Sequence, residues 1–155
     1  MISFVKTAGG GSGHAPVSGR LQRLLAPICL AAFGLPTAGH AETYAREGCQ
    51  VTVPSGWIVS RSRVASPDKK TWAALSSAGS AAEIVQVETS LKAVKVSENA
   101  QIILMASSAS FGGLTNRQFH AITKTTPSCL ADVTAPAGAT EANARAIAMT
   151  IRPAR

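Results

Sequence analysis

The first clear alternation of hydrophobic and polar residues runs from Cys49 to Val53. Hydrophobic side chains occupy every second position of this stretch (CQVTV), a period that predicts a half-buried β-strand. Proline and glycine follow at Pro54 and Gly56, and both favour a turn. Extended character resumes at Trp57. Residues 49–59 are therefore predicted to form a β-hairpin or a strand–turn–strand corner.

Residues 83–96 fit two periods at once. Val85, Val87 and Leu91 fall on one side at a period of two, whereas Ile84, Val87 and Leu91 also match a helical stripe. The β-branched content favours a strand, because such side chains lose χ1 freedom in a helix. A strand is predicted here, with a helix as the alternative.

Residues 97–113 predict the main helix of the protein. Ser97 can cap its start, and Glu98 would lie in the first turn, where the helix dipole favours an acid. Gly112 and Gly113 would end it.

Strand patterns recur at residues 71–77, 117–125 and 144–152, and a short helix beginning near Thr140 can precede the last of these. Together these elements predict a small single α+β domain. It consists of an antiparallel sheet of about five to six strands, with one main helix packed on a face.

The segment ahead of this domain has the pattern of a secretory signal peptide. No acidic residue precedes Glu42, and the apolar run at residues 24–35 is about a dozen residues long. A membrane-spanning helix needs roughly 20 residues, whereas a short apolar run behind basic residues and ahead of small ones is typical of an export signal. We expect cleavage between Ala41 and Glu42. Residues 1–41 would be removed, and residues 42–155 would form the mature protein in the periplasm or outside the cell, without a transmembrane anchor.

The mature chain keeps two cysteines, Cys49 and Cys129. An even number of cysteines in an exported protein predicts a disulfide, and only one pairing exists here. A redox or nucleophilic thiol is the alternative, but no C-x-x-C motif is present and no histidine lies close to either cysteine in the sequence.

Charge argues against nucleic acid as a partner. Residues 42–155 carry twelve of the fifteen basic residues and all eight acidic residues, so the net charge is mild. The basic residues are scattered, whereas nucleic-acid-binding proteins usually cluster them on one face.

Candidate chemistry is sparse. His120 is the only histidine after residue 41, and Asp132 is its candidate partner as a catalytic carboxylate. The strand pattern places His120 on the outward side, so an exposed sheet histidine is the simpler interpretation. Glu83 and Glu88 would point to opposite faces of a strand, which argues against a shared cleft. No three clustered ligands are evident, so neither a metal site nor a cofactor is predicted.

Trp57 and Trp72 are candidates for an exposed binding platform, although buried packing is the simpler role for both. The stretch VPSGW at residues 53–57 resembles the beginning of PsbP-like exported domains. The resemblance covers these five residues only, and it assigns no site residue in this chain.

The sequence therefore predicts an exported, disulfide-bonded protein of the bacterial envelope or secreted fraction, more consistent with a non-catalytic role than with an enzyme. It would act as a binding, accessory or inhibitor module, with a protein or envelope component as its partner. One alternative is a small secreted hydrolase that uses His120 and a carboxylate. Another is a structural subunit of an envelope assembly, favoured if an apolar strand edge is left open.

Overall fold

The computed structural model describes residues 40–155, apart from the side chain of Phe111. Residues 1–39 of the predicted signal peptide lie outside the described range. The expected cleavage site, between Ala41 and Glu42, lies within it. The described residues belong to one compact unit. The described elements are β1 (Ala41–Arg46), β2 (Cys49–Pro54), β3 (Ile58–Val59), β4 (Val64–Ala65), β5 (Trp72–Ala78), α1 (Ala81–Ser90), β6 (Val94–Glu98), β7 (Ile102–Phe111), β8 (Leu114–Thr123), β9 (Ser128–Pro136), α2 (Glu141–Ala148) and β10 (Arg152–Pro153).

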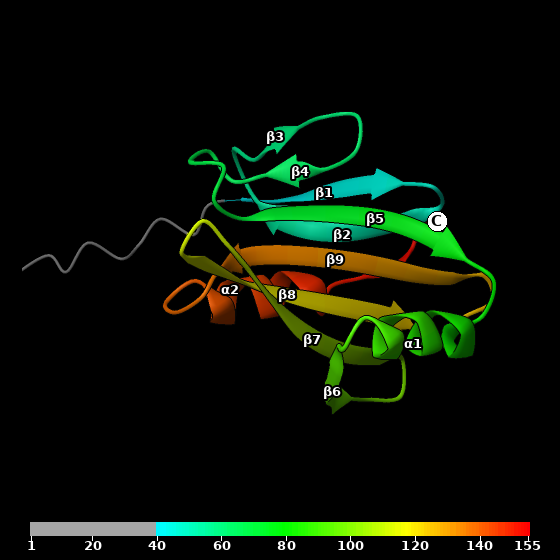
Figure 1. The fold of residues 1–155 in the computed structure, drawn as a ribbon. Helices are drawn as coiled ribbons and strands as arrows, with labels where there is room; N and C mark the ends of the chain where they lie inside the picture. The colour runs from blue at the N-terminus through cyan, green and yellow to red at the C-terminus, as the bar shows by residue number, and fades with distance from the viewer. Residues whose placement is uncertain (1–39) are drawn as a thin grey trace, which may run out of the picture. The chain divides into compact units, whose positions relative to one another are not determined.

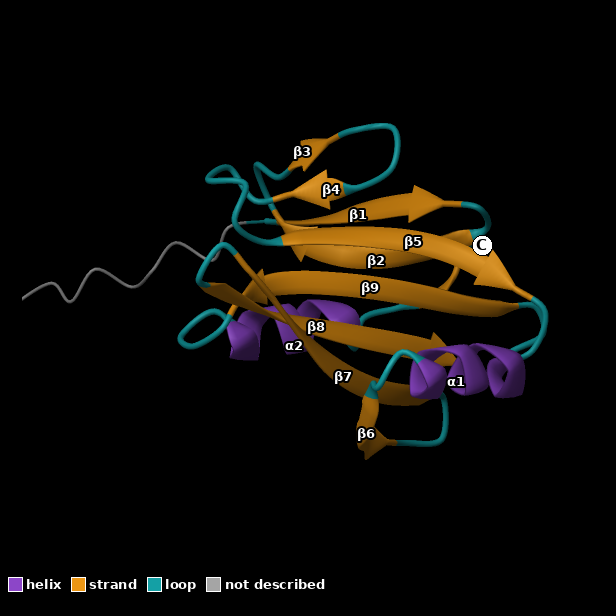
Figure 2. Cartoon of the chain, viewed as in Figure 1, coloured by secondary structure: helices purple, strands orange, loops and turns teal. Residues whose placement is uncertain are grey.

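Within residues 40–155 the strands form two antiparallel sheets (Figures 1 and 2). The smaller sheet has the order β1-β2-β10, and the larger one has the order β3-β4-β5-β9-β8-β7-β6. The sequence predicted a single sheet of five to six strands and one main helix. The described chain instead has ten strands and two helices, so the protein is richer in β-structure than expected.

The two faces of the larger sheet are covered differently. We call one the sealed face, because α2 and the smaller sheet pack against it. Its core includes Leu104, Phe119, Ala131 and Val133. We call the other the open face. Of the described helices it carries α1, whose Ile84 packs with a smaller cluster of side chains, namely Ala93, Met105 and Ile122.

The Cys49–Cys129 disulfide, predicted from the sequence, is present. It joins β2 of the smaller sheet to β9 of the larger one across 80 residues of sequence. Both cysteines are buried, with exposed fractions of 0% and 2%. The bond therefore links the two layers inside the sealed face.

The strand predicted for residues 83–96 was wrong over most of its length, because residues 81–90 form α1. A capping box begins this helix. The Ser80 side chain accepts a hydrogen bond from the backbone N–H of Glu83, and the Glu83 carboxylate accepts one from the backbone N–H of Ser80. These two bonds satisfy N–H groups that a helix start leaves free. They outweigh the modest strand preference of the β-branched residues, and only the end of the segment, from Val94, is a strand.

The helix predicted for residues 97–113 was also wrong. Residues 102–111 form β7, a strand paired with both β6 and β8. At the covered end of this strand, Leu104 and Met105 are both buried, although they point to opposite faces. A strand that is buried on both faces has a continuous run of apolar residues in its sequence. The periodicity of such a run does not distinguish a strand from a helix. Gly112 and Gly113 form the two-residue turn to β8, with φ values of 58° and 80°.

At the C-terminus, most of the strand predicted for residues 144–152 is helical. The short helix expected near Thr140 is α2, which has Thr140 as its N-cap residue. Residues 57–59 turn a corner rather than closing a hairpin, because β3 pairs with β4 and not with β2. Among residues 40–155, no helix has both the length and the apolar character needed to cross a membrane.

Candidate functional site

The open face is organised as rows of cross-strand neighbours. Because side chains alternate along a strand, every second residue of β5, β9, β8 and β7 points to this face. Three rows follow from the strand register: Trp72, Thr134, Gln118 and Ser107; then Ala74, Asp132, His120 and Met105; then Ser76, Leu130, Ile122 and Ile103. Helix α1 packs over the third row, and no described helix packs over the first.

His120 lies at the border between the covered and uncovered parts of this face. It is directly opposite Asp132 in the β8–β9 register, and its Nδ1 lies 2.6 Å from Asp132 Oδ1. Its Nε2 lies 3.0 Å from the hydroxyl oxygen of Ser107. Ser107 in turn donates a hydrogen bond to Oε1 of Gln118, at 3.1 Å. A continuous chain of hydrogen bonds thus runs from Asp132 to Gln118 across three strands.

Glu88 approaches the same histidine from α1. Its Oε2 lies 3.0 Å from Nδ1 of His120. The Glu88 side chain is only 7% exposed and that of His120 is 10% exposed, whereas that of Asp132 is 36% exposed. Potential ligand atoms of all three residues lie within 4.8 Å of one another. The cluster is therefore enclosed by the helix and the sheet and reaches solvent mainly through Asp132.

Two buried side-chain oxygen atoms in the described part of the chain lack a hydrogen-bond partner, Glu88 Oε2 and Thr134 Oγ1. Glu88 Oε2 lies near Nδ1 of His120, but that nitrogen is hydrogen-bonded to Asp132. Both lie on the open face, Glu88 from α1 and Thr134 from the first row. Leaving such an atom without a partner costs about 1–3 kcal/mol. Among the described residues, the buried side-chain atoms without a hydrogen-bond partner thus lie on one face of one sheet.

The environment shifts the pKa values of two groups in the cluster. Burial is the main cause that raises the pKa of Glu88. The charge of His120 lowers this pKa, whereas the negative charge of Asp132 raises it. For His120, burial would lower the pKa, but the hydrogen bond to Asp132 and the charges of Asp132 and Glu88 outweigh it and raise the pKa. The cluster therefore favours a protonated histidine that donates from both ring nitrogens.

The sequence named His120 and Asp132 as candidates, considered Glu88 only as a partner of Glu83, and missed Ser107 and Gln118. His120 does point to the face opposite Phe119, as its strand pattern indicated, but it is buried at 8% exposure rather than exposed. The opposite-face argument for Glu83 and Glu88 was wrong because both lie on a helix, where Glu83 caps the start and Glu88 faces the sheet. Ser107 was missed because its segment was predicted to be helical. The pairing of His120 with Asp132 follows from the register between β8 and β9.

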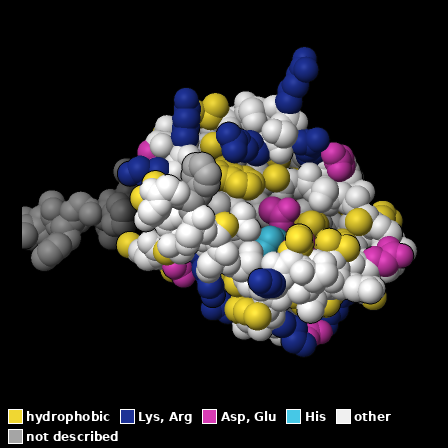
Figure 3. Space-filling model, in the orientation of Figure 1, with side chains coloured by type: hydrophobic (Ala, Val, Ile, Leu, Met, Phe, Trp, Pro, Cys, Tyr) yellow, Lys and Arg dark blue, Asp and Glu magenta, His cyan; other side chains and the backbone are white. Residues whose placement is uncertain are grey.

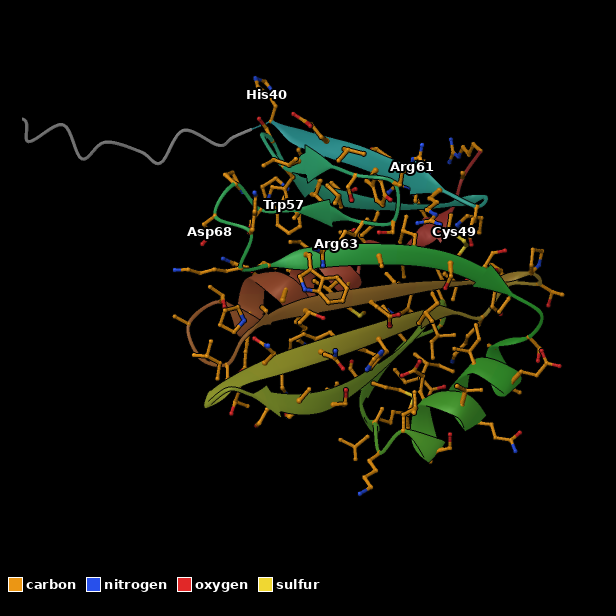
Figure 4. All side chains as sticks on the ribbon, turned by 45° about the horizontal axis from the view of Figure 1, so that its top comes forward. His40, Cys49, Trp57, Arg61, Arg63 and Asp68 are labelled. Atoms are coloured by element: carbon orange, nitrogen blue, oxygen red, sulfur yellow. A yellow bond between two sulfur atoms is a disulfide. The ribbon has the colours of Figure 1, made fainter. Side chains whose placement is uncertain are left out.

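The two tryptophans proposed as binding residues lie in different places. Trp72 is in the first row of the open face, and the guanidinium of Arg63 lies 5.5 Å from its ring centroid. Arg63 and Trp57 are labelled in Figure 4. Trp57 packs against the core of the sealed face. It also borders a cavity of about 450 Å³ together with Asp68 and Thr140. Only Trp72 shares a face with His120.

The outer edge of β7 borders the first row. β6 pairs with β7 only as far as Ala106, so residues 107–111 (SSASF) have β8 on one side and no described strand on the other. In a hairpin closed by a two-residue turn, hydrogen-bonded and non-hydrogen-bonded pairs alternate from the turn. The backbone groups of Ser108 and Ser110 therefore point outward, away from β8.

A groove lies on the sealed-face side near the start of this edge. It has a volume of about 560 Å³ and is lined by residues of β6, β8 and α2, including Val96, Arg117 and Phe119, and by Met149 just after α2. Arg117 and Phe119 are the β8 partners of Ser108 and Ala106. The groove thus meets β7 where its free edge begins.

Charged side chains are scattered over the visible surface, whereas acidic and histidine side chains lie together near the middle of the open face beside hydrophobic ones (Figure 3). No family model matches the sequence, and no curated protein matches it. The fold is similar to a crystal structure from Bacteroides thetaiotaomicron VPI-5482, with a TM-score of 0.50 and 12% sequence identity. The similarity covers 76% of this chain and 49% of the other, so this chain spans about half the length of that protein. At this identity the similarity concerns the fold alone.

Proposed function

We propose that this chain is an exported binding module that takes up an extended segment of a partner protein by strand addition to the free edge of β7. Export is supported by the signal-like pattern of residues 1–41 and by a disulfide of a kind that persists in oxidising compartments. The observation that carries the binding proposal is the five-residue edge at 107–111, which has no described strand partner on its outer side.

This edge lacks the features by which proteins usually protect sheet edges. Short length, lysine, proline and β-bulges all discourage pairing with another chain. At the opposite edge of the same sheet, β3 and β4 have only two residues each. β4 pairs with β5 only at Trp72 and Ala73, so residues 74–78 of β5 also have no described strand on their outer side. β6 contains Lys95 and a register shift between Lys95 and Ser97. Residues 107–111 contain none of these features, so their outward N–H and C=O groups are available to an added strand.

The surroundings of the edge offer contacts to both faces of an added strand. Alternate side chains of a bound strand point to opposite faces of the sheet. Those on the sealed-face side would lie at the groove lined by Arg117 and Phe119. A side chain opposite Ser107 on the other side would extend the first row toward the His120 cluster. Backbone pairing would supply affinity, and these two regions would supply specificity.

The test uses a displayed library of random peptides, because it requires no known partner. Binders are selected on the immobilised protein, and their affinities are then measured for Ser108→Pro and for its matched control, Ser108→Ala. Proline removes an outward N–H, whereas alanine keeps it and removes only the hydroxyl. We expect Ser108→Pro to weaken binding by about fivefold or more, the equivalent of one lost hydrogen bond of about 1 kcal/mol. Ser108→Ala should bind within about twofold of the parent protein on the same scale.

Circular dichroism of both variants verifies that the fold is retained. Failure to enrich any peptide would contradict the proposal, and so would an equal loss in the two variants, because the side chain rather than the backbone edge would then be responsible. Self-association that Ser108→Pro abolishes would instead favour the structural-subunit alternative.

A second candidate function is hydrolysis. The specific observation in its favour is the chain of Ser107, His120 and Asp132, in which a hydroxyl, an imidazole and a carboxylate follow one another within hydrogen-bond distance. Against it, the Ser107 hydroxyl hydrogen is directed to Gln118. The backbone N–H of Ser107 belongs to a hydrogen-bonded pair with Gln118, so it is not free to form an oxyanion hole. Ester hydrolysis by the purified protein that is lost in Ser107→Ala would establish this function in place of a purely binding role.

A further inference from the structure

Three side chains on the open face converge as the ligands of a metal ion do. Nδ1 of His120 lies 2.6 Å from Asp132 Oδ1 and 3.0 Å from Glu88 Oε2. Nitrogen and oxygen ligands bind Zn²⁺ at about 2.0–2.2 Å, so neighbouring ligand atoms of one tetrahedral ion lie roughly 3.4 Å apart. Small rotations of these side chains would therefore make room for an ion among them.

An independent observation is a buried carboxylate oxygen whose need for a partner is not met. Glu88 Oε2 has no hydrogen-bond partner, although the side chain is only 7% exposed and is aimed at His120. A neutral or protonated imidazole carries at most one hydrogen on Nδ1, and Asp132 Oδ1 is the closer acceptor. One N–H cannot serve two carboxylates equally, whereas a divalent cation can bind both.

We propose that Glu88, His120 Nδ1 and Asp132 form a binding site for a divalent first-row transition-metal ion. One imidazole nitrogen with two carboxylates is a donor set that suits Zn²⁺, Mn²⁺ or Fe²⁺, whereas Ca²⁺ and Mg²⁺ prefer oxygen ligands throughout. The two carboxylates of Glu88 and Asp132 would balance the charge of the ion. The ion in turn would remove the repulsion between these two neighbouring acids.

The contacts around the histidine fit this role. A metal-bound histidine usually donates its other ring N–H to an acceptor, which fixes the tautomer and the ring orientation. Here Ser107 Oγ lies 3.0 Å from Nε2 and donates its own hydrogen to Gln118. Nε2–H can therefore donate to Ser107 and leave the lone pair of Nδ1 free for the ion.

The site would retain an open coordination position. Glu88 comes from a helix fixed by its capping box, and the other two ligands come from adjacent central strands, so the frame is rigid. Asp132 is 36% exposed toward the uncovered rows, which provides a path for the ion and for a further ligand. Three protein ligands with one position for water or substrate are typical of catalytic rather than structural zinc sites.

The test is calorimetric titration of the untagged protein with Zn²⁺ and with Mn²⁺, using Mg²⁺ as the comparison ion. We expect one ion per chain for a transition metal, and at least tenfold weaker binding in Glu88→Gln and in His120→Ala. Glu47→Gln is the matched control for Glu88→Gln, because it removes the same group from an exposed position, and it should bind as the parent protein does. Ser107→Ala should weaken binding by about 10-fold, as the loss of outer hydrogen-bond partners does in known sites.

A second measurement covers the case in which a substitution disturbs the fold. Visible absorption of Co²⁺ reports coordination by the protein directly, and circular dichroism reports whether each variant is folded. The proposal is overturned if no transition metal binds at millimolar concentration. It is equally overturned if Glu88→Gln and His120→Ala bind as tightly as the parent protein. Because no peptide enters this titration, its result is separate from that of the strand-addition experiment.

Discussion

The two faces of the larger sheet show how one set of strands can serve two purposes. On the sealed face, Leu104, Ala121, Ala131 and Val133 are all completely buried beneath α2 and the smaller sheet. On the open face, one ten-residue helix covers the third row and reaches only the edge of the second. The first face is closed by apolar contacts and a disulfide, whereas the second holds the buried ionisable groups and both unpartnered polar atoms of the described residues.

The difference indicates that the sealed face contributes most to stability, whereas the open face carries the ionisable groups. Apolar burial stabilises in proportion to the area removed from water, so a fully covered face contributes most to folding. Buried ionisable groups cost free energy unless they are paired. A protein can carry such groups on one face when the other is well packed, and the open face is where a ligand would recover that cost.

The largest expected effect would come from breaking the sealed face at its disulfide. Replacing Cys49 and Cys129 together by alanine removes a cross-link that spans 80 residues. Loop-entropy arguments assign such a link about 4 kcal/mol, acting through the unfolded chain. We expect a decrease of that order in the free energy of unfolding, measured by chemical denaturation of the double variant. A decrease below about 1 kcal/mol would show that packing alone closes the sealed face, at odds with that loop-entropy value.

The next effect compares one leucine beneath the sealed face with one outside the core. Leu104 is 0% exposed, and Leu91, just after α1, is 66% exposed. Leu104→Ala should destabilise the protein by about 2–5 kcal/mol, because it removes buried contacts and leaves a cavity. Leu91→Ala should change stability by less than about 0.5 kcal/mol, as exposed substitutions usually do. Urea unfolding of the two variants measures the difference, and equal losses would mean that the two faces are not packed as described.

The smallest effect concerns pH and the open face. Glu88 and His120 both have raised pKa values in the folded state. The folded protein therefore binds a proton at each side chain more tightly than the unfolded chain does. Their stabilising contributions are therefore complete below the unfolded pKa values and are lost as pH rises through the folded ones. With a chelator present, the free energy of unfolding should fall as pH increases above about 4.5, the ordinary pKa of a glutamate side chain.

Glu88→Gln tests this directly because the amide keeps the shape of the side chain and does not titrate. The variant should show a shallower decrease of stability with pH, and at neutral pH it should be as stable as the parent or more stable by roughly 1 kcal/mol. Glu47→Gln, which removes an exposed acid, serves as the control. A pH dependence identical to that of the parent protein would mean that Glu88 is not protonated more readily in the folded state.

Local patterns in the sequence predicted some elements well. The alternation at residues 49–53 and the apolar positions around Trp72 became β2 and β5. The two main errors, at residues 83–96 and 97–113, share a physical cause. In both segments the local signals were balanced, and packing decided the outcome. Glu83 completed a capping box in the first segment, whereas burial of Leu104 and Met105 on opposite faces made the second a strand.

The candidate site was predictable only in part. His120 and Asp132 could be named because few other residues in the chain have suitable chemistry, but no local pattern indicated the distance between them. Their pairing required the β8–β9 register, and Ser107 joined them only once β7 was known to be a strand. Glu88 could not be placed on the site from the sequence, because its position depends on how α1 packs over the third row.

The sequence alone determined the cysteine pairing of the mature chain, the signal-like leader and the set of side chains available for chemistry. Each of these depends on composition and on short-range order along the chain. The tertiary structure decided which face of the sheet each residue occupies, which strand edge remains free and which ionisable groups meet. These features depend on contacts between residues far apart in the chain, and free energies of packing, not local preferences, select among the possible arrangements.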